Sequence, residues 1–168
     1  KLVGLNTSEN SIKLFYDKGQ VVFISSNQII TTRTLEGSYP NYSQLVPDTF
    51  SKLLTFNTKK IIESLERIAV LADQQSSVVK IKLDDNDIAF ISADAQDIGS
   101  ANESLPVIYD GEKFDIAFNV RYLLEGLKVI SSQNVILKCN LPTTPAVIVP
   151  EDNINAFTYL VMPVQVRS

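Results

Sequence analysis

Two stretches of the chain alternate apolar and polar positions with the period of a helix. They are Phe56–Asp73, FNTKKIIESLERIAVLAD, and Phe118–Ser132, FNVRYLLEGLKVISS. In both, apolar residues recur at three- and four-residue spacing and fill one arc of roughly 120° on a helical wheel. Each stretch opens with a Phe followed by an Asn that can cap the first turn. Both are therefore predicted to be amphipathic helices.

The segments with strand periodicity repeat as well. Ile12–Ser25 aligns without a gap on Val79–Ser92, and each consists of two alternating strands around a polar turn. Asn134–Val149 is a looser third version, with its turn at Leu141–Thr144. Chance similarity of short apolar patterns is the alternative, but helix, hairpin and their order match together. The sequence predicts an α+β fold of duplicated units, each a helix followed by antiparallel strands.

The remaining segments fit around these repeats. Gly37–Pro47 contains two prolines and is predicted to be an extended linker, because a proline biases the residue before it away from helix. Lys1–Leu5 is interpreted as the end of a helix. Additional strands are predicted at Ser11–Tyr16, Gln20–Ser25, Gln28–Thr34 and Lys52–Phe56, with a final strand and an apolar tail in Tyr159–Ser168.

Composition narrows the class of protein. At 168 residues the chain can bury a sizeable core, and its 20% charged residues are ordinary for a globular domain. No apolar run approaches the roughly 20 residues of a membrane helix, and no signal peptide is evident at Lys1, so no membrane partner is expected. A single cysteine allows no intrachain disulfide, which suits a protein of the reducing cytoplasm. Cys139 is the only cysteine and lies in a strand pattern, which predicts a buried apolar residue rather than a reactive one.

The chain lacks the usual chemistry of an enzyme. It has no histidine, so no Ser-His or Cys-His pair and no common zinc site can form. The six glycines are scattered and form no phosphate-binding loop. The paired carboxylates Asp84-Asp85 and Glu151-Asp152 fall in predicted turns, where solvation explains them. These residues do not exclude an enzyme, but none of them argues for one, and no cofactor is expected.

Charge is distributed unevenly over an acidic chain of net charge −4. Lys59, Lys60 and Arg67 fall on the polar side of the first helix, and Arg121 and Lys128 on that of the second. A solvated surface is the simpler interpretation, and a surface that faces an anionic partner is the other.

One apolar pair does not fit the helical pattern. Val70 and Leu71 fall opposite the apolar arc of the first helix. Fraying of the last helical turn or a contact with another subunit would each explain them.

Four segments together resemble one known family. Thr32–Pro47 (TRTLEGSYPNYSQLVP), SLERIAVLAD, FNVRYLLEGL and the ending YLVMPV are similar to the bacterial sliding clamp, the beta subunit of DNA polymerase III. The resemblance covers essentially the whole chain. It implies the DNA-clamp fold, a ring of similar domains with helices inside and sheets outside. Residues 1–47 would be the C-terminal half of the middle domain with its linker, and residues 48–168 the complete third domain.

The resemblance also implies a function without catalysis. In this family two subunits close a homodimeric ring around duplex DNA. The ring holds the polymerase III catalytic subunit, the clamp loader and other proteins that carry a clamp-binding motif. Basic residues on the inner helices face phosphates without sequence preference. By position, the implied DNA-facing residues are Lys59, Lys60, Arg67, Arg121 and Lys128.

Two further sites are implied by the same resemblance. One is a pocket between the middle and third domains for a short linear peptide, where apolar and Met side chains adapt to Leu and Phe anchors. Its residues would be Pro40, Gln44, Leu45, Asn119, Tyr122, Thr144, Ala146, Leu160, Val161, Met162, Pro163 and Val164. The other is the joint between subunits, with Val70, Leu71, Asp97 and Glu103.

Two interpretations stay open on the residues alone. Met162-Pro163 also fits an ordinary edge strand ended by proline. The second hypothesis for the whole chain, after the clamp, is an antiparallel α+β module that binds proteins and never contacts DNA, and an enzyme is a distant third.

Overall fold

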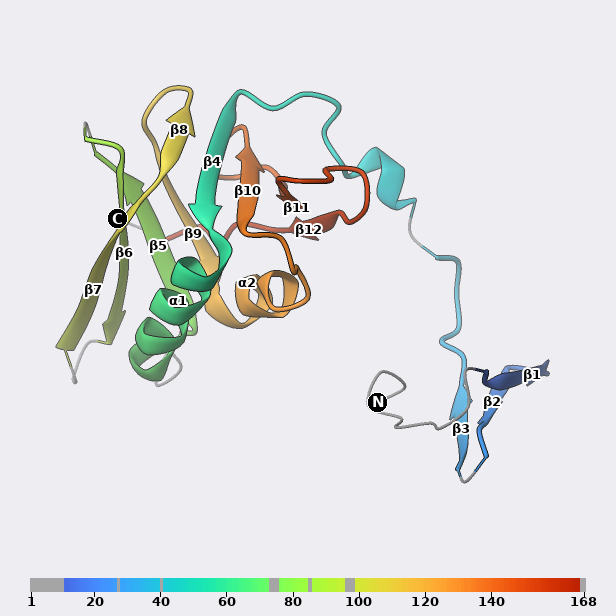
Figure 1. Cartoon of the computed structure of the whole chain (residues 1–168). Coiled ribbons are helices and arrows are strands. Elements are labelled where there is room, and N and C mark those ends of the chain that lie inside the picture. The colour runs from blue at the N-terminus through green and yellow to red at the C-terminus, as the bar shows by residue number, and fades with distance from the viewer. Residues whose placement is uncertain are drawn as a thin grey trace. The chain divides into compact units, whose positions relative to one another are not determined.

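The computed structural model describes residues 11–26, 28–39, 41–72, 76–84, 86–95 and 99–166. The chain divides into two compact units, Lys1–Pro40 and Asn41–Ser168 (Figure 1). The helix end expected at Lys1–Leu5 lies outside the described residues.

The first unit contains a three-stranded antiparallel meander. Its strands are β1 (Lys13–Asp17), β2 (Gln20–Ile24) and β3 (Ile29–Arg33), in the order β1-β2-β3. Lys18 and Gly19 connect β1 to β2 in two residues with φ of 42° and 81°, a backbone that suits the twist of a tight hairpin. The strands predicted for this region are confirmed to within two residues at each end.

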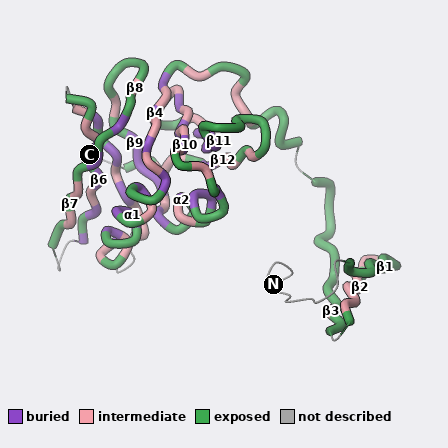
Figure 2. The backbone as a smooth tube through the Cα atoms, viewed as in Figure 1, coloured by how far each residue is buried: buried purple, intermediate pink, exposed green. Residues whose placement is uncertain are grey.

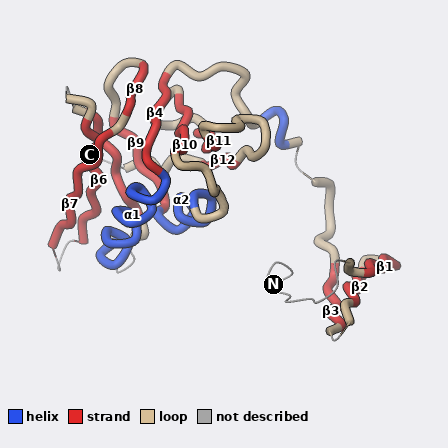
Figure 3. Tube along the Cα trace, viewed as in Figure 1, coloured by secondary structure: helices blue, strands red, loops and turns tan. Residues whose placement is uncertain are grey.

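The second unit contains the two predicted helices and two antiparallel sheets (Figure 3). A five-stranded sheet has the order β12-β11-β10-β4-β8, and a four-stranded sheet has the order β7-β6-β5-β9. In chain order the elements are η2 (Tyr42–Gln44), β4 (Lys52–Asn57), α1 (Thr58–Ala72), β5 (Val78–Leu83), β6 (Ile88–Ala95), β7 (Gly99–Pro106), β8 (Ile108–Asp110), β9 (Asp115–Asn119), α2 (Val120–Leu127), β10 (Asn134–Cys139), β11 (Ala146–Pro150) and β12 (Tyr159–Val161).

The pairing of strands confirms the internal duplication. The strand before each helix pairs with the first strand after the other helix, β4 with β10 and β9 with β5. The backbone N–H of the first residue in each helix also bonds in an equivalent way, to a carbonyl in the segment that follows the other helix. Thr58 N–H donates to Gln133 O at 3.0 Å, and Val120 N–H donates to Ser77 O at 2.8 Å. Each of the two helix-and-strand repeats in the second unit therefore contributes a strand to the sheet of the other repeat.

Both helices pack side by side on the strands, and one hydrophobic core lies between the helices and the sheets (Figure 2). Phe118 and Leu54 are fully buried in the same cluster as the apolar residues of the two helices, which include Ile61, Leu65, Leu123 and Leu127. The core contains a cavity of about 20 Å³, and its lining comes from both helices and both sheets. The apolar periodicity predicted this core correctly.

The two helices begin as predicted, but the second ends early. Asn57 Oδ1 accepts from Lys60 N–H at 3.1 Å, and Asn119 Oδ1 accepts from Arg121 N–H at 3.0 Å, so both predicted caps are confirmed. The helix expected to reach Ser132 stops at Leu127. Ile130 N–H then bonds to Leu127 O and the Ile130 side chain turns back into the core. The helix thus ends before the buried Ile130, which lies four residues before the start of β10.

The linker and the second hairpin also depart from the sequence prediction. Residues Tyr42–Gln44 form a 3₁₀ turn rather than extended chain, and Tyr42 O accepts from both Leu45 N–H and Val46 N–H. Although the two hairpins align without a gap, their registers differ by one residue. Asp17 pairs with Gln20, whereas the last pair of the second hairpin is Leu83 with Ala89. The Asp84 carboxylate accepts from Asn86 N–H and Ile88 N–H, which stabilises the longer turn.

Cys139 is buried in β10, as predicted, and is only 1% exposed. Burial in apolar surroundings raises the pKa of its thiol to about 12, so the reactive thiolate is scarce at neutral pH. In the part of the chain that the structure describes, no helix is long and apolar enough to cross a membrane.

Candidate functional site

The exposed sides of α1 and α2 face the same way. On α1 the exposed positions include Lys59, Lys60 and Arg67, and on α2 they include Arg121 and Lys128. The two helices contact each other, and Lys128 Nζ lies 2.7 Å from Glu66 Oε1, so their exposed sides meet along this pair. The exposed sides of the two helices therefore adjoin each other, and Lys59, Lys60, Arg121 and Lys128 are among their exposed residues.

Carboxylates lie among these basic residues and neutralise part of their charge. Besides the Glu66–Lys128 pair, Lys59 Nζ lies 3.8 Å from Glu63 Oε1 one turn along α1. Both pairs are half exposed or more, so solvent and salt screen them and each adds little to stability. The lysine side chains of these pairs can therefore reorient toward another anion at a small cost in free energy.

Arg67 is different, because it contacts Glu103, which the family resemblance assigned to the joint between subunits. Its Nε donates to Glu103 Oε1 at 2.5 Å and its Nη2 donates to Oε2 at 2.6 Å. Ser64 Oγ, on a fully buried residue of α1, donates to the same Oε2 at 2.7 Å. The guanidinium hydrogen bonds lower the pKa of the Glu103 carboxyl, and Glu103 in turn raises the pKa of Arg67. Fork-shaped pairs of this kind are the strong and geometrically specific ones.

The structure removes one of the two explanations for Val70 and Leu71, which interrupt the apolar pattern. Helix α1 continues to Ala72, so the last turn is not frayed at these residues. Val70 is 72% exposed and Leu71 is partly exposed. Asp97, the fourth residue assigned to the subunit joint, lies outside the described residues.

A few of the predicted peptide-pocket residues lie on the C-terminal tail and at the start of α2. Val164 N–H donates to Ala117 O of β9 at 2.8 Å, only two residues before the Asn119 cap of α2. Tyr122, in the first turn of α2, is 55% exposed, and Met162 on the tail is 54% exposed. The tail and the start of α2 therefore form adjacent surface.

Not every predicted pocket residue is accessible. Ala146 pairs with Val161 between β11 and β12, and both side chains are buried in the core. Leu160 and Thr144 are partly exposed beside them, as is Pro163. From the linker, Leu45 is half exposed and Gln44 is exposed at the end of η2, whereas Pro40 lies outside the described residues.

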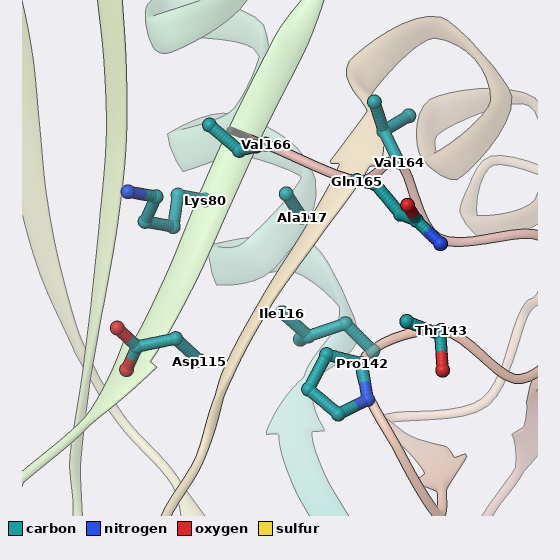
Figure 4. Close-up of a pocket in the computed structure, with 9 residues that line it drawn as sticks. All are labelled: Lys80, Asp115, Ile116, Ala117, Pro142, Thr143, Val164, Gln165 and Val166. Carbon is teal, nitrogen blue, oxygen red and sulfur yellow. The ribbon is translucent and has the colours of Figure 1, made fainter. Parts of the chain in front are cut away.

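A groove of about 400 Å³ runs beside the tail (Figure 4). Of its residues only Val164 belongs to the predicted pocket. The others are Lys80, Asp115, Ile116, Ala117, Pro142, Thr143, Gln165 and Val166. The alternation of apolar and polar residues in the segments that form β5 and β9 would have been enough to predict Lys80 and Asp115 on the outer face of the sheet. Nothing in the sequence alone indicated that the tail would cross that face. Among the described residues, no three His, Cys, Asp or Glu side chains gather so that they could hold a metal ion.

Comparison of the sequence with known protein families shows which family the chain belongs to. The family described as the C-terminal domain of the DNA polymerase III beta subunit matches residues 43–165. The chain belongs to this family. The resemblance noted in the sequence and the expected clamp fold are thereby confirmed.

Individual beta subunits agree with this result. The beta sliding clamp of Synechococcus elongatus is 43% identical over 169 residues, which cover 100% of this chain and 45% of the relative. The solved beta chain of DNA polymerase III from Streptococcus pneumoniae is 30% identical, with a TM-score of 0.79 over 92% of this chain and 41% of its own. The beta subunit from Thermotoga maritima is 29% identical, also with a TM-score of 0.79, over 96% of this chain and 44% of its own. The chain thus spans less than half the length of these relatives.

Proposed function

We propose that this chain is the C-terminal part of a sliding clamp, a non-catalytic ring that encircles duplex DNA and keeps the polymerase on its template. The observation that carries the proposal is the common direction of the exposed sides of α1 and α2, which meet at the Glu66–Lys128 pair. A surface made of two repeated helices, with sheets behind it, is suited to form a segment of a ring wall. In this proposal the full-length protein is a homodimer and acts in the bacterial cytoplasm, where DNA polymerase III copies the chromosome.

The DNA contacts in this proposal are electrostatic and independent of sequence. Lys59, Lys60, Arg121 and Lys128 would face phosphates, with Arg67 contributing less because Glu103 shares its charge. Glu63 and Glu66 lie among them and keep the attraction weak. Weak backbone contacts suit a ring that must slide, since each phosphate contact has to break as the next one forms.

The peptide site in this proposal is centred on the tail and the start of α2. Met162 and Tyr122 supply accessible apolar surface, and Leu160, Pro163 and Val164 extend it. From the linker, Pro40, Gln44 and Leu45 would add the neighbouring wall, with Asn119 and Thr144 at the rim. The buried Ala146 and Val161 would support this surface from below. The partners would be the polymerase catalytic subunit, the clamp loader and other proteins with a clamp-binding motif.

The domain assignment is part of the same proposal. Residues 48–168 would be the third clamp domain, and residues 1–47 the C-terminal half of the middle domain with its linker. Several apolar side chains of β1 and β3 are more than half exposed, including Leu14, Phe15 and Ile29. Such side chains need a covering surface, which the other half of a middle domain would provide.

The proposal is tested by whether the protein stays on a closed DNA circle and leaves a linear one. The full-length protein, loaded on nicked circular DNA by a clamp loader, should stay bound at a salt concentration that removes ordinary DNA-binding proteins. It should then leave within seconds to minutes once a restriction enzyme linearises the circle, because only an encircling ring is released through DNA ends. Gel filtration of the protein–DNA complex before and after cleavage measures this. Retention that is unaffected by linearisation would contradict encirclement.

The alternative function is a protein-interaction module that never contacts DNA. The observation in its favour is that Lys59, Arg67 and Lys128 each lie near a carboxylate of the same chain. In that case the full-length protein would fail to stay on circular DNA at all, although it would still bind its peptides.

A single side chain on the tail tests the peptide site. Met162→Ala should weaken a Leu- and Phe-containing clamp-binding peptide by about 1–2 kcal/mol, because it removes an accessible apolar contact. Isothermal titration calorimetry on the full-length protein measures this. Val129→Ala is the matched control, since Val129 is 63% exposed at the far end of α2. Equal affinities for the Met162 variant and the parent protein would argue against the site.

A further inference from the structure

Helix α2 contains a glycine at a buried position near its C-terminal end. Gly126 has no left-handed backbone angle, and the helix continues beyond it to the cap at Lys128, so neither its backbone nor the cap requires a glycine there. Alanine stabilises a helix more than glycine does, because glycine loses more conformational entropy on folding. A glycine in such a place usually has a packing or functional reason.

The reason is the ring of Tyr159, which lies directly against the backbone of Gly126. A Cβ atom added to Gly126 would come closest to Cδ1 of that ring, and it would lie 2.7 Å from Cε1 and 2.8 Å from Cγ. Carbon atoms in favourable contact lie about 3.5–4.0 Å apart, so one extra methyl group cannot share this space with the ring. We call Gly126 and Tyr159 the ring seat.

Neighbouring side chains show how the ring lies in this seat. The Phe157 ring stacks on the Tyr159 ring, with centroids 6.4 Å apart and 9° between the planes. Burial raises the pKa of the Tyr159 hydroxyl, and Glu125 and Tyr122 raise it further, so the hydroxyl lies close to these two residues of α2. Residues 122, 125 and 126 share one side of the helix, because positions three and four apart are neighbours on its surface. The ring therefore lies along the side of α2 that carries Tyr122.

The ring seat also bears on the position of the tail. Tyr159 is the first residue of β12, an edge strand that in the described part of the chain pairs only with β11, through three residue pairs. Met162 follows β12 directly, and two residues later Val164 N–H donates to Ala117 O at 2.8 Å. A short edge strand opens locally more readily than a central one. Packing of the Tyr159 ring on α2 therefore helps to hold Met162 in place.

We propose that Gly126 is a positioning residue for the peptide site. It admits the Tyr159 ring against α2, and the ring fixes β12 so that Met162 and Tyr122 present one pre-formed apolar surface. Gly126 is itself buried and does not contact a peptide on that surface. A pre-formed surface binds more tightly than one that must be ordered on binding. The inference rests on the proposed peptide site and adds to it a residue outside the predicted pocket.

Peptide affinity tests the inference. Isothermal titration calorimetry of the full-length protein with a synthetic Leu- and Phe-containing clamp-binding peptide measures it. Gly126→Ala should raise the dissociation constant about tenfold, although alanine is the better helix former, because the displaced ring moves β12. Tyr159→Ala removes the ring and should also lose about tenfold. Adding Gly126→Ala to Tyr159→Ala should then change the affinity less than about twofold, since the methyl group meets no ring.

The same methyl group without the ring is thus the matched control. Tyr159→Leu gives a second background without the ring, which carries the test if Tyr159→Ala does not fold.

A second measurement follows the tail without any peptide. Carbon-13 labelling of the methionine methyl groups gives Met162 its own resonance, assigned by its loss in Met162→Leu. Gly126→Ala should shift this resonance, because Met162 moves relative to the aromatic ring of Tyr122. The shift caused by Gly126→Ala should be absent in the background without the Tyr159 ring.

The outcomes separate this inference from its rivals. Parental affinity in Gly126→Ala, or a Met162 resonance that stays in place, would overturn it. Equal losses from Gly126→Ala with and without the Tyr159 ring would mean that the methyl group acts through another contact, which also overturns it. A parent protein that does not bind the peptide would instead refute the proposed peptide site itself.

Discussion

Reversing the charge of Lys59 and Arg121 together is expected to weaken duplex DNA binding by the full-length protein about 100-fold at low salt. The two residues occupy equivalent positions on the repeated helices, and both are exposed on the side away from the sheets. Each reversal removes one phosphate contact and adds a repulsion. The slope of log affinity against log salt should therefore fall by about two. Fluorescence anisotropy of a labelled duplex over a salt series measures both quantities.

The opposite face of the same domain provides a matched control. Lys80 and Lys82 on β5 alternate with buried residues that point at the helices, so their side chains lie on the outer face of the sheet. Reversing both to Glu changes the net charge by the same amount. This control variant should lose only a few-fold in affinity, through the general field of the molecule. If the two double variants weaken binding equally, the helices do not form the DNA-facing surface.

The largest effect on stability is expected from Phe118→Ala, which should lower the free energy of unfolding by about 3–5 kcal/mol. Phe118 is fully buried where β9 runs into α2, and it pairs in register with Val79 of β5. Its removal leaves a cavity between both sheets and both helices that the surrounding strands cannot fill. Urea denaturation of the chain followed by far-UV circular dichroism measures the loss.

Another phenylalanine of the same sheet gives the comparison. Phe90 on β6 is 44% exposed and lies on the outer face, beside Lys82. Because its ring leaves little cavity behind, Phe90→Ala should cost less than about 1 kcal/mol. Similar losses for Phe90→Ala and Phe118→Ala would contradict the position of the core.

The fold was largely predictable because local signals and the repeat agreed with each other. The Asn residues before α1 and α2 cap those helices as expected, and the apolar arcs of both helices are buried. The strands of the three hairpin-like segments also form where period-two alternation predicted them. Each of these features depends on neighbours within about four residues, which a sequence shows directly.

The features that sequence did not predict depend on distant parts of the chain. Helix α2 ends at Leu127 because Ile130 is drawn into a core built by other elements. Strand β7 is mostly polar and forms by pairing with β6, so no apolar alternation revealed it.

The candidate sites illustrate the same limit. The family resemblance selected Arg67 and Glu103 for two different roles, and only coordinates reveal that they bind each other. The groove beside the tail likewise depends on the Val164–Ala117 hydrogen bond, which joins residues almost fifty positions apart. Position in a motif gives the region of a site, but not the contacts made within it.

The exchange of strands between the two repeats governs how the second unit can fold. Strand β4 is synthesised before α1, but it can pair with β10 only after α2 has been made. The four-stranded sheet can form once β9 has been made, whereas the five-stranded sheet lacks β10, β11 and β12 until α2 has been made, so one side of β4 stays unpaired until then. Contacts this far apart in sequence raise the entropy of loop closure and slow the folding rate. Once formed, the interlocked halves should unfold in one concerted step, with neither repeat persisting as an intermediate.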